Sequence, residues 1–315
     1  MEETYALELR DISKRFGSVQ ANDHVNLTLR KSEILAILGE NGSGKTTLMN
    51  MIYGIYYPDE GHIFVNGKEV TIRSPKDSYE LGIGMVHQHF KLVDVLTAAE
   101  NIVLGLPGKG KLDMKRITED IQKLADKYGF ELDLSQKIYE MSVSQKQTVE
   151  IVKVLFRGAD ILILDEPTSY LDVRHKLEFL SILQKLCRER QLTVILSLHE
   201  LELAEKISDR ILCVNGRAVD RIGTPEEVMT DGYITQLYGI RMGSYDEASS
   251  DMELAAPEGT PQVFVIAGAG NGRKTYRRLQ RAGIPFATGI LYENDLDYPV
   301  AKALAAEVIA EHPFE

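Results

Sequence analysis

Cysteine is scarce in this sequence of 315 residues: only Cys187 and Cys213 occur, in separate apolar stretches. Two isolated cysteines suit a reducing compartment and indicate neither a disulfide framework nor a metal site. Long apolar runs are also missing, since none approaches the roughly 18 residues that a membrane-spanning helix needs. The acidic start, MEETYALELRDISKRF, has no basic-then-apolar export leader. We therefore expect a cytoplasmic protein without a membrane-spanning helix.

Positive charge is in deficit as well: 36 Lys and Arg face 47 Asp and Glu, for a formal net charge of −11. A nucleic-acid scaffold, or a protein that binds anionic lipid directly, carries a basic surface, so both classes are disfavoured. If the protein works at a membrane, we expect it to do so through a protein partner. The length fits one large α/β domain with a small additional one.

The pattern of apolar residues divides the chain into three parts. Residues 1–240 alternate strand-like and helical segments and predict an α/β domain, in which about residues 90–156 are helical and strongly charged. Residues 241–261 are acidic, contain Ser, Gly and Pro, and lack apolar periodicity, so they predict a linker. Residues 262–315 predict a small β-α-β-α domain. It ends in a helix over PVAKALAAEVIAE with no closing strand, which leaves open whether the domain is complete.

The stretch GENGSGKTT fits the pattern G-x-x-x-x-G-K-[ST], with a buried strand before it and a helix after it. Glycines are needed there because backbone N–H groups wrap a β-phosphate without a Cβ in the way. Lys45 supplies charge to the β- and γ-phosphates, and the Thr46 hydroxyl is a Mg²⁺ ligand. The flanking strand and helix disfavour the alternative, a glycine turn that contains Lys-Thr by chance. The residues expected to bind the nucleotide are Gly39, Asn41, Gly42, Ser43, Gly44, Lys45, Thr46 and Thr47.

Two adjacent acids, Asp165 and Glu166, follow the short apolar strand ILIL. Beside a phosphate loop, Asp165 is placed to hold the hydration shell of Mg²⁺ opposite Thr46. Glu166 is then the candidate to orient or deprotonate an attacking water. The alternative is a solvated strand end, where acid pairs are common; the phosphate loop makes a catalytic role the favoured interpretation.

The order of these motifs resembles the ATPase subunit of an ATP-binding-cassette (ABC) transporter over about residues 5–240. The resemblance implies that Phe16 stacks on adenine and that Gln88, in MVHQHF, reaches Mg²⁺ and the water. It implies that His199, in LSLHE, contacts the γ-phosphate, and that Asp172, at the end of SYLD, lies in the loop that crosses the interface of two subunits. Each of these residues is a weak signal alone, and the inference depends on their joint order and spacing.

The resemblance also implies a fold and a set of partners. The expected fold class is α/β of the P-loop NTPase type, with a mixed sheet core, an antiparallel β subdomain and a helical subdomain, here with a small C-terminal βα extension. ATP and Mg²⁺ are the implied cofactors, with Thr46, Asp165 and Gln88 holding the metal partly through water. Two cassettes, identical or different, would enclose two ATP molecules. The other implied partners are transmembrane permease subunits and a solute-binding protein, with no nucleic acid, which places the chain at the inner face of the cell membrane.

The segment YEMSVSQKQTVEI stands where the family carries the signature L-S-G-G-Q, but Val143 and Ser144 replace both glycines. Ser142 with Gln145, and Ser144 with Gln147, form capping boxes that predict a helix start. The free N–H groups there suit a γ-phosphate held by the other subunit. If either replaced position has a positive φ, its Cβ costs on the order of 1 kcal/mol. We therefore predict a working but weaker site; an ordinary capped helix without a ligand is the alternative.

The two halves of the chain resemble different transporter groups. The front, through DEPT, is similar to ATPases of nucleoside and simple-sugar importers, and the back is similar to ATPases of iron–siderophore and cobalamin importers. This division raises the hypothesis of a mosaic with a seam near DEPT. In the family the helical subdomain, from Gln88 to about Phe156, receives the permease, so we expect the front half to decide the substrate. The alternative function is a nucleotide-binding regulator with weak or no turnover.

The stretch GAGNG, Gly268 to Gly272, follows an apolar strand and raises the question of a second, dinucleotide site. The full G-x-G-x-x-G spacing is not present, because Arg273 or Lys274 stands where the third glycine belongs. A plain tight turn in a regulatory or dimer-stabilising tail is the other interpretation, and both stay open.

Overall fold

The structure is a computed structural model that describes residues 5–106, 113–230, 232–246 and 251–313. The chain divides into two compact units, residues 1–228 and residues 229–315.

The first unit is built on two sheets. Its strands are β1 (Leu7–Phe16), β2 (Val19–Leu29), β3 (Ile34–Leu38), β4 (Glu60–Val65), β5 (Lys68–Val70), β6 (Ile83–Val86), β7 (Ile161–Leu164), β8 (Thr193–Ser197), β9 (Arg210–Asn215) and β10 (Ala218–Gly223). The antiparallel sheet has the order β2-β1-β4-β5, and the mixed sheet has the order β10-β9-β3-β8-β7-β6. In the mixed sheet only β10 runs antiparallel to its neighbour.

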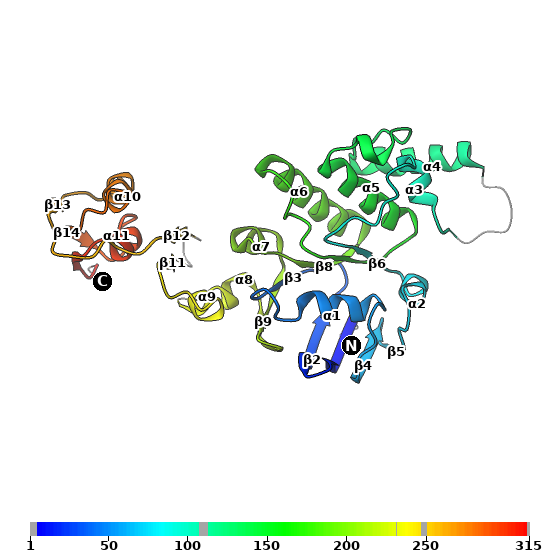
Figure 1. The fold of residues 1–315 in the computed structure, drawn as a ribbon, viewed down its shortest axis with the longest axis horizontal. Coiled ribbons are helices and arrows are strands. Elements are labelled where there is room, and N and C mark those ends of the chain that lie inside the picture. Colours follow the sequence, from blue (N-terminus) through cyan, green and yellow to red (C-terminus); the bar gives the residue numbers. More distant parts are fainter. Residues whose placement is uncertain (1–4, 107–112, 231, 247–250, 314–315) are drawn as a thin grey trace. The chain divides into compact units, whose positions relative to one another are not determined.

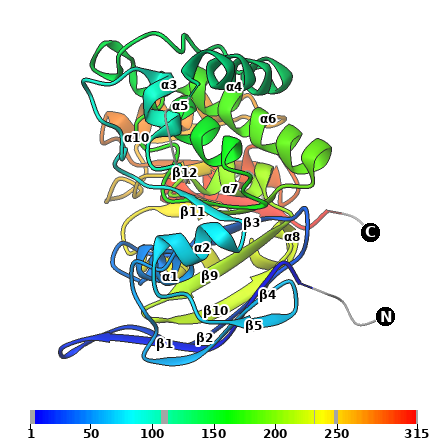
Figure 2. The ribbon, with the colours of Figure 1, turned by 90° about the vertical axis from the view of Figure 1, so that its right-hand side faces the viewer.

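The first unit has eight α-helices in the part of the chain that the structure describes. They are α1 (Lys45–Ile52), α2 (Pro75–Glu80), α3 (Ala98–Val103), α4 (Met114–Tyr128), α5 (Val143–Phe156), α6 (Val173–Arg190), α7 (Leu201–Ile207) and α8 (Pro225–Val228). Helices α3 to α6 gather on the side of the mixed sheet that faces away from the antiparallel sheet (Figures 1 and 2). Helices α3, α4 and α5 fall within the segment that the sequence predicts to be helical.

One apolar core joins the antiparallel sheet, α1 and the mixed sheet. The central strands β3 and β8 are buried at every position, as expected of parallel strands covered on both faces. Because the carboxyl ends of parallel strands meet at one edge, the loops that follow β3, β6, β7 and β8 converge there. The candidate site is built on this edge.

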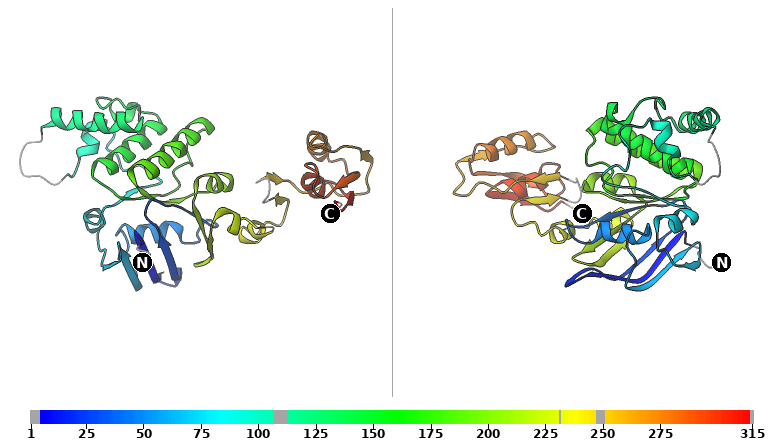
Figure 3. Two further views of the ribbon diagram at one scale, coloured as in Figure 1. Left: turned by 180° about the vertical axis from the view of Figure 1, so that it is seen from behind. Right: turned by 45° about the vertical axis from the view of Figure 1, so that its right-hand side comes forward.

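In the second unit, strands and helices alternate along most of the chain. Its elements are α9 (Tyr233–Leu237), β11 (Ser244–Asp246), β12 (Asp251–Glu253), β13 (Val263–Val265), α10 (Arg273–Arg281), β14 (Phe286–Tyr292), α11 (Tyr298–Leu304) and β15 (Glu307–Glu311). Strands β13, β14 and β15 form a parallel sheet, and α10 and α11 share one core with β14 (Figure 3).

Two features of this unit differ from the sequence-based expectation. The predicted helix over PVAKALAAEVIAE is wrong in its second half, because α11 ends at Leu304 and residues 307–311 form β15, the closing strand. Residues 241–261 are also folded in part, since β11 and β12 pair with each other. Gly243 permits this pairing: its φ is +92°, and a Cβ there would lie 2.4 Å from the carbonyl oxygen of Glu253. Such a contact leaves no apolar period in the sequence.

Candidate nucleotide site

The phosphate loop connects β3 to α1, and the side chain of Lys45 bonds back to the backbone of the loop. The ammonium of Lys45 donates hydrogen bonds to the carbonyl oxygens of Gly39 and Glu40, at 2.7 and 2.8 Å. Lys45 is buried, and burial lowers its pKa from the usual value, although the nearby carboxylates of Glu166, Asp165 and Glu40 oppose the shift. Within the described part of the chain the hydrogen bonds of this buried cation go to carbonyl oxygens, so it is well placed to exchange them for phosphate oxygens.

Two glycines of this loop are required by the surrounding backbone as well as by a phosphate. Gly39 has φ +148°, and a Cβ there would lie 2.3 Å from the carbonyl oxygen of Val214. Gly44 has φ +94°, and its Cβ would lie 2.2 Å from the carbonyl oxygen of Ala21. The Ser43 hydroxyl in the same loop is buried and has no hydrogen-bond partner among the described residues. The loop therefore offers a buried polar group that a bound phosphate could satisfy.

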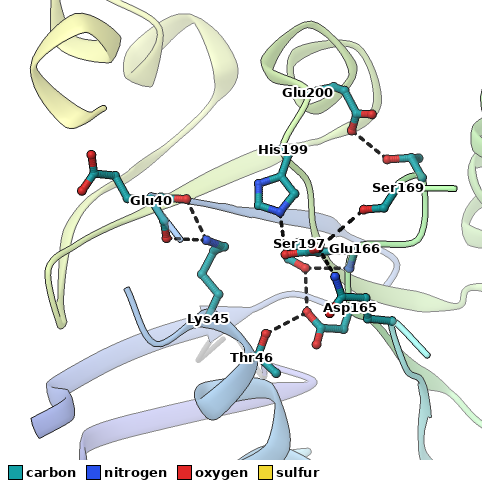
Figure 4. A network of polar contacts seen from close by, with 12 residues as sticks. Glu40, Lys45, Thr46, Asp165, Glu166, Ser169, Ser197, His199 and Glu200 are labelled. Atoms are coloured by element: carbon teal, nitrogen blue, oxygen red, sulfur yellow. Dashed lines mark hydrogen bonds and ion pairs between the residues drawn. The ribbon is translucent and has the colours of Figure 1, made fainter. Parts of the chain in front are cut away.

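The two acids follow β7, as the sequence predicts. Asp165 accepts hydrogen bonds from the hydroxyls of Ser197, at 2.9 Å, and Thr46, at 3.2 Å (Figure 4). Burial raises the pKa of the Asp165 carboxyl above its usual value, while these two hydrogen bonds oppose the rise. Thr46 and Asp165 thus present two oxygen donors side by side, which is the donor type that Mg²⁺ prefers.

Glu166 lies at the centre of a cluster of polar side chains. Its carboxylate oxygens lie 2.5 Å from Nε2 of Gln88 and 2.5 Å from Nε2 of His199. Its backbone N–H donates to the Ser197 hydroxyl at 2.8 Å. Its φ is +48°, a left-handed conformation that costs a non-glycine residue on the order of 1 kcal/mol. The fold therefore holds Glu166 in a strained position between the loops after β6 and β8 (Figure 4).

The signature segment begins α5. Ser142 and Gln145 form the predicted capping box, with both reciprocal hydrogen bonds present. The second predicted box is wrong: the Ser144 hydroxyl lies 3.1 Å from the Ser142 hydroxyl, and Gln147 donates elsewhere. Val143 and Ser144 are the first two helical residues and neither has a positive φ, so the anticipated backbone strain is absent. They differ from glycine here by their side chains: the apolar volume of Val143, and the hydroxyl that Ser144 places beside Ser142.

Two other predicted residues lie away from the Glu166 cluster. Phe16 is 41% exposed at the end of β1, with its ring 5.0 Å from that of Tyr56, so it is available for stacking and is not a core aromatic. Asp172 caps α6 by accepting from the N–H of His175 at 2.9 Å. This backbone hydrogen bond lowers the pKa of the Asp172 carboxyl.

Several polar residues of the site were not anticipated from the sequence. Ser197 binds both acids, and its only signal is a hydroxyl at the end of the apolar run TVIL. Glu200 accepts from the Thr168 hydroxyl, at 2.8 Å, and from the ammonium of Lys176, at 2.5 Å, which ties the loop after β8 to the start of α6. Their partners are distant in sequence, so no local spacing identifies them.

The glycine-containing turn of the second unit is already occupied by carboxylates. Asp297, fully buried, accepts from the N–H groups of Gly272 and Arg273 at the start of α10, at 2.8 and 3.2 Å. Asp295 accepts from the N–H of Ala269. These donors are the ones that a pyrophosphate would need, so the structure favours the tight turn over the dinucleotide site.

Comparisons with known proteins point to one family. A family model described as ABC transporter matches residues 22–169. The guanosine import ATP-binding protein NupO of Bacillus subtilis is 45% identical over 267 residues, which cover 84% of this chain and 51% of the relative. An uncharacterized ABC transporter ATP-binding protein of Methanocaldococcus jannaschii is 31% identical over 280 residues, covering 87% of this chain and 95% of the relative.

Solved structures point the same way. The structure of cbiO1 from Clostridium perfringens, part of the ABC transporter complex cbiONQ, is 26% identical, with a TM-score of 0.64 over 76% of this chain and 96% of that chain. Among the described residues, no helix is both long and apolar enough to cross a membrane.

These relatives also bear on the two halves of the chain. The chain spans about half the length of the first curated relatives, 51% of NupO and 43% of the nucleoside import ATP-binding protein NupA of Lactococcus lactis. The resemblance of the front half to importers of nucleosides is confirmed, and that of the back half stays a prediction. Single relatives match 84% and 87% of the chain and so extend across the expected seam, which counts against a mosaic.

Proposed function

Because the chain belongs to the family of ABC transporter ATP-binding proteins, we propose that it hydrolyses ATP to drive a membrane permease that imports a nucleoside or a simple sugar. The observation that carries this proposal is that the loops after β6 and β8 meet Glu166, on the loop after β7, while Thr46 at the start of α1 meets the adjacent Asp165. They bring together Lys45, Asp165, Gln88 and His199, each of which has a separate task in phosphoryl transfer to water.

Binding of the nucleotide begins at the phosphate loop. Lys45 exchanges its two carbonyl partners for phosphate oxygens, and the loop N–H groups and the Ser43 hydroxyl add donors. Thr46 and Asp165 would hold Mg²⁺, with Gln88 close to the same edge of the sheet. When bound, Mg²⁺ supplies positive charge beside the β- and γ-phosphates. Phe16, exposed at the end of β1, is the proposed stacking surface for adenine.

Glu166 is the proposed group that orients the attacking water and accepts its proton. Gln88 and His199 bind its two carboxylate oxygens in this structure, so they hold the carboxylate in the cleft before a water takes their place. The same His199 is then free to donate to the γ-phosphate. Positioning and charge neutralisation supply the acceleration, as expected for this reaction class.

The proposed cassette and permease partners are supported by the family and by one groove. A second copy or a related cassette would place the start of α5, Ser142 to Gln145, against the γ-phosphate, across the exposed loop that ends at Asp172. A groove of about 440 Å³ lies between the mixed sheet and the helices, lined by Tyr53, His87, Glu150 and Lys153 among others. It is the proposed seat of a permease segment at the cytoplasmic side of the membrane. The nucleoside or sugar substrate, and a solute-binding protein that delivers it, are proposed from the names of the relatives alone.

The alternative, a regulator that binds nucleotide without turnover, is favoured by the two replaced glycines of the signature. Hydrolysis rates of the parent chain and its Glu166→Gln variant decide between the two. The ATPase interpretation expects the variant to be slower by roughly a hundredfold, because a positioned base contributes on that order. Glu202→Gln, an exposed Glu of α7, is the matched control and should keep the parent rate. Equal rates for parent and Glu166→Gln, in the presence of a co-purified permease, would favour the regulator.

A further inference from the structure

Helix α5 carries two buried polar side chains that neither phosphate binding nor helix capping explains. Gln147 and Glu150 are each 4% exposed. They stand three residues apart, so they lie on one face of the helix. Burial of such groups is unfavourable unless each finds a partner, so their partners indicate why this face is polar.

Gln147 bonds to the loop that carries Glu166. Its side-chain amide donates to the carbonyl oxygen of Pro167, the residue after Glu166, at 2.7 Å. A small cavity beside this bond is lined by residues of α5 and of both loops, among them Val143, Gln147, Gln88, Glu166 and Tyr170. The start of α5 and the catalytic carboxylate therefore share one packed environment.

Glu150 bonds to the loop that carries Gln88. Its carboxylate accepts from the backbone N–H of Lys91, three residues after Gln88, at 2.6 Å. Lys153 completes this link by pairing with Glu150, at 3.5 Å, and donating to the carbonyl oxygen of Lys91, at 3.2 Å. One face of α5 thus bonds to the backbone of two loops: at Pro167, next to Glu166, and at Lys91, close to Gln88.

We propose that Gln147 and Glu150 are positioning residues through which α5 sets the placement of Glu166 and Gln88 in the same chain. The inference rests on the proposed function, in which Ser142 at the start of α5 meets the ATP held by the second copy. A shift of α5 on meeting that ATP would then move both loops of its own site together. Binding of ATP at one site would then change the positions of Glu166 and Gln88 at the other site, because α5 is hydrogen-bonded to both of their loops.

The test is a mixed dimer in which one chain carries Glu166→Gln, so that ATP is hydrolysed only at the intact chain. Gln147→Met removes the amide donor with little change in length. It is placed first in the intact chain and then in the Glu166→Gln chain, whose signature serves the working site. A positioning role lowers kcat roughly tenfold in the first arrangement, with KM for ATP nearly unchanged, and leaves kcat within about twofold in the second.

A role in shaping the signature predicts the opposite pattern, because the working ATP meets the α5 start of the other chain. An equal or larger loss in the second arrangement, or no loss in either, would overturn the inference. The matched control is Thr148→Val, which removes a side-chain hydrogen bond that stays inside α5, to the carbonyl oxygen of Ser144; it should behave as the parent in both arrangements.

Two further measurements separate failure of the inference from misfolding of the variant and from failure of the proposed function. Gln147→Glu keeps the shape and removes the donor, so it should repeat the result of Gln147→Met if the methionine variant fails to fold, which thermal unfolding would show. If the mixed dimer with Gln147 intact shows no ATP hydrolysis and no ATP-dependent dimerisation, the proposed function fails, and this inference fails with it. If that dimer is active but Gln147 can be replaced without effect, only the inference fails.

Discussion

Ser197 bonds to both acids, and its replacement by alanine is a sharp test of the site. The hydroxyl lies at the end of β8 and is fully buried. It donates to the Asp165 carboxylate at 2.9 Å and accepts from the N–H of Glu166 at 2.8 Å. Ser197→Ala removes both bonds by deleting one oxygen atom. We expect the backbone of the strand to keep its conformation.

The expected cost follows from the two partners. A hydrogen bond to a charged group contributes about 1.5–3 kcal/mol, and a buried N–H left without a partner costs about 1–3 kcal/mol. The two effects share one site and do not add fully, so we expect the free energy of unfolding to fall by about 3 kcal/mol. For a unit of this size that lowers the unfolding midpoint by roughly 6–12 °C. The strained φ of Glu166 also loses a restraint, so we expect hydrolysis to slow about tenfold, the change that about 1.4 kcal/mol of lost positioning would give.

The assay pairs thermal unfolding of the nucleotide-free chain with the rate of ATP hydrolysis. Thr193→Val is the matched control, because Thr193 is buried at the other end of β8 and its hydroxyl accepts from the N–H of Ser32, at 3.1 Å, away from the two acids. It should lower stability by about 1 kcal/mol and leave the hydrolysis rate unchanged. The reasoning is refuted if Ser197→Ala unfolds at the parent temperature, or if Thr193→Val slows hydrolysis as much as Ser197→Ala does.

Three other measurements test separate features. Burial lowers the pKa of His87, so the unfolded chain takes up a proton as pH falls below about 6.5 while the folded chain does not; stability should fall from pH 7 to pH 5, and His87→Gln should reduce that loss in unfolding scans. Ser144→Gly removes a side chain beside the proposed γ-phosphate without relieving backbone strain, so ATP-driven dimerisation should strengthen while the free energy of unfolding falls by up to about 1 kcal/mol; unchanged dimerisation and unchanged hydrolysis would show that the serine does not weaken the site. Burial raises the pKa of Cys187 to about 11, and its thiol bonds to the carbonyl oxygen of Ser32, so a thiol reagent at pH 8 should modify it only on unfolding.

Local patterns predicted the parts of the site that depend on short-range geometry. The loop ending in Lys45 and Thr46 must follow a strand and open a helix, and the acids Asp165 and Glu166 must follow a buried strand; both conditions are visible in a dozen residues. The cap of α5 is similarly local, because Ser142 and Gln145 satisfy each other's backbone.

Errors arose where a local pattern had two physical solutions. AEVIAE reads as the end of a helix, yet pairing with β14 makes EVIAE a strand, because a neighbouring strand overrides a helical preference. Ser144 and Gln147 have the spacing of a capping box, but the carbonyl oxygen of Pro167 takes the amide of Gln147. Backbone strain, expected only if Val143 or Ser144 had a positive φ, is absent because both residues lie in the first turn of α5 and neither has a positive φ.

By itself the sequence determined the chemistry: which residues carry charge, hydroxyl or amide groups, and which short segment has the pattern of a phosphate-binding loop. Only the tertiary structure decided how these groups are held, because Ser197, Glu150 and Gln147 find partners in the loops that follow other strands, β6 and β7. Hydrogen bonds depend on distances of a few tenths of an ångström between groups far apart in the chain. Such distances are set by the packing of the whole unit, and a sequence pattern does not contain them.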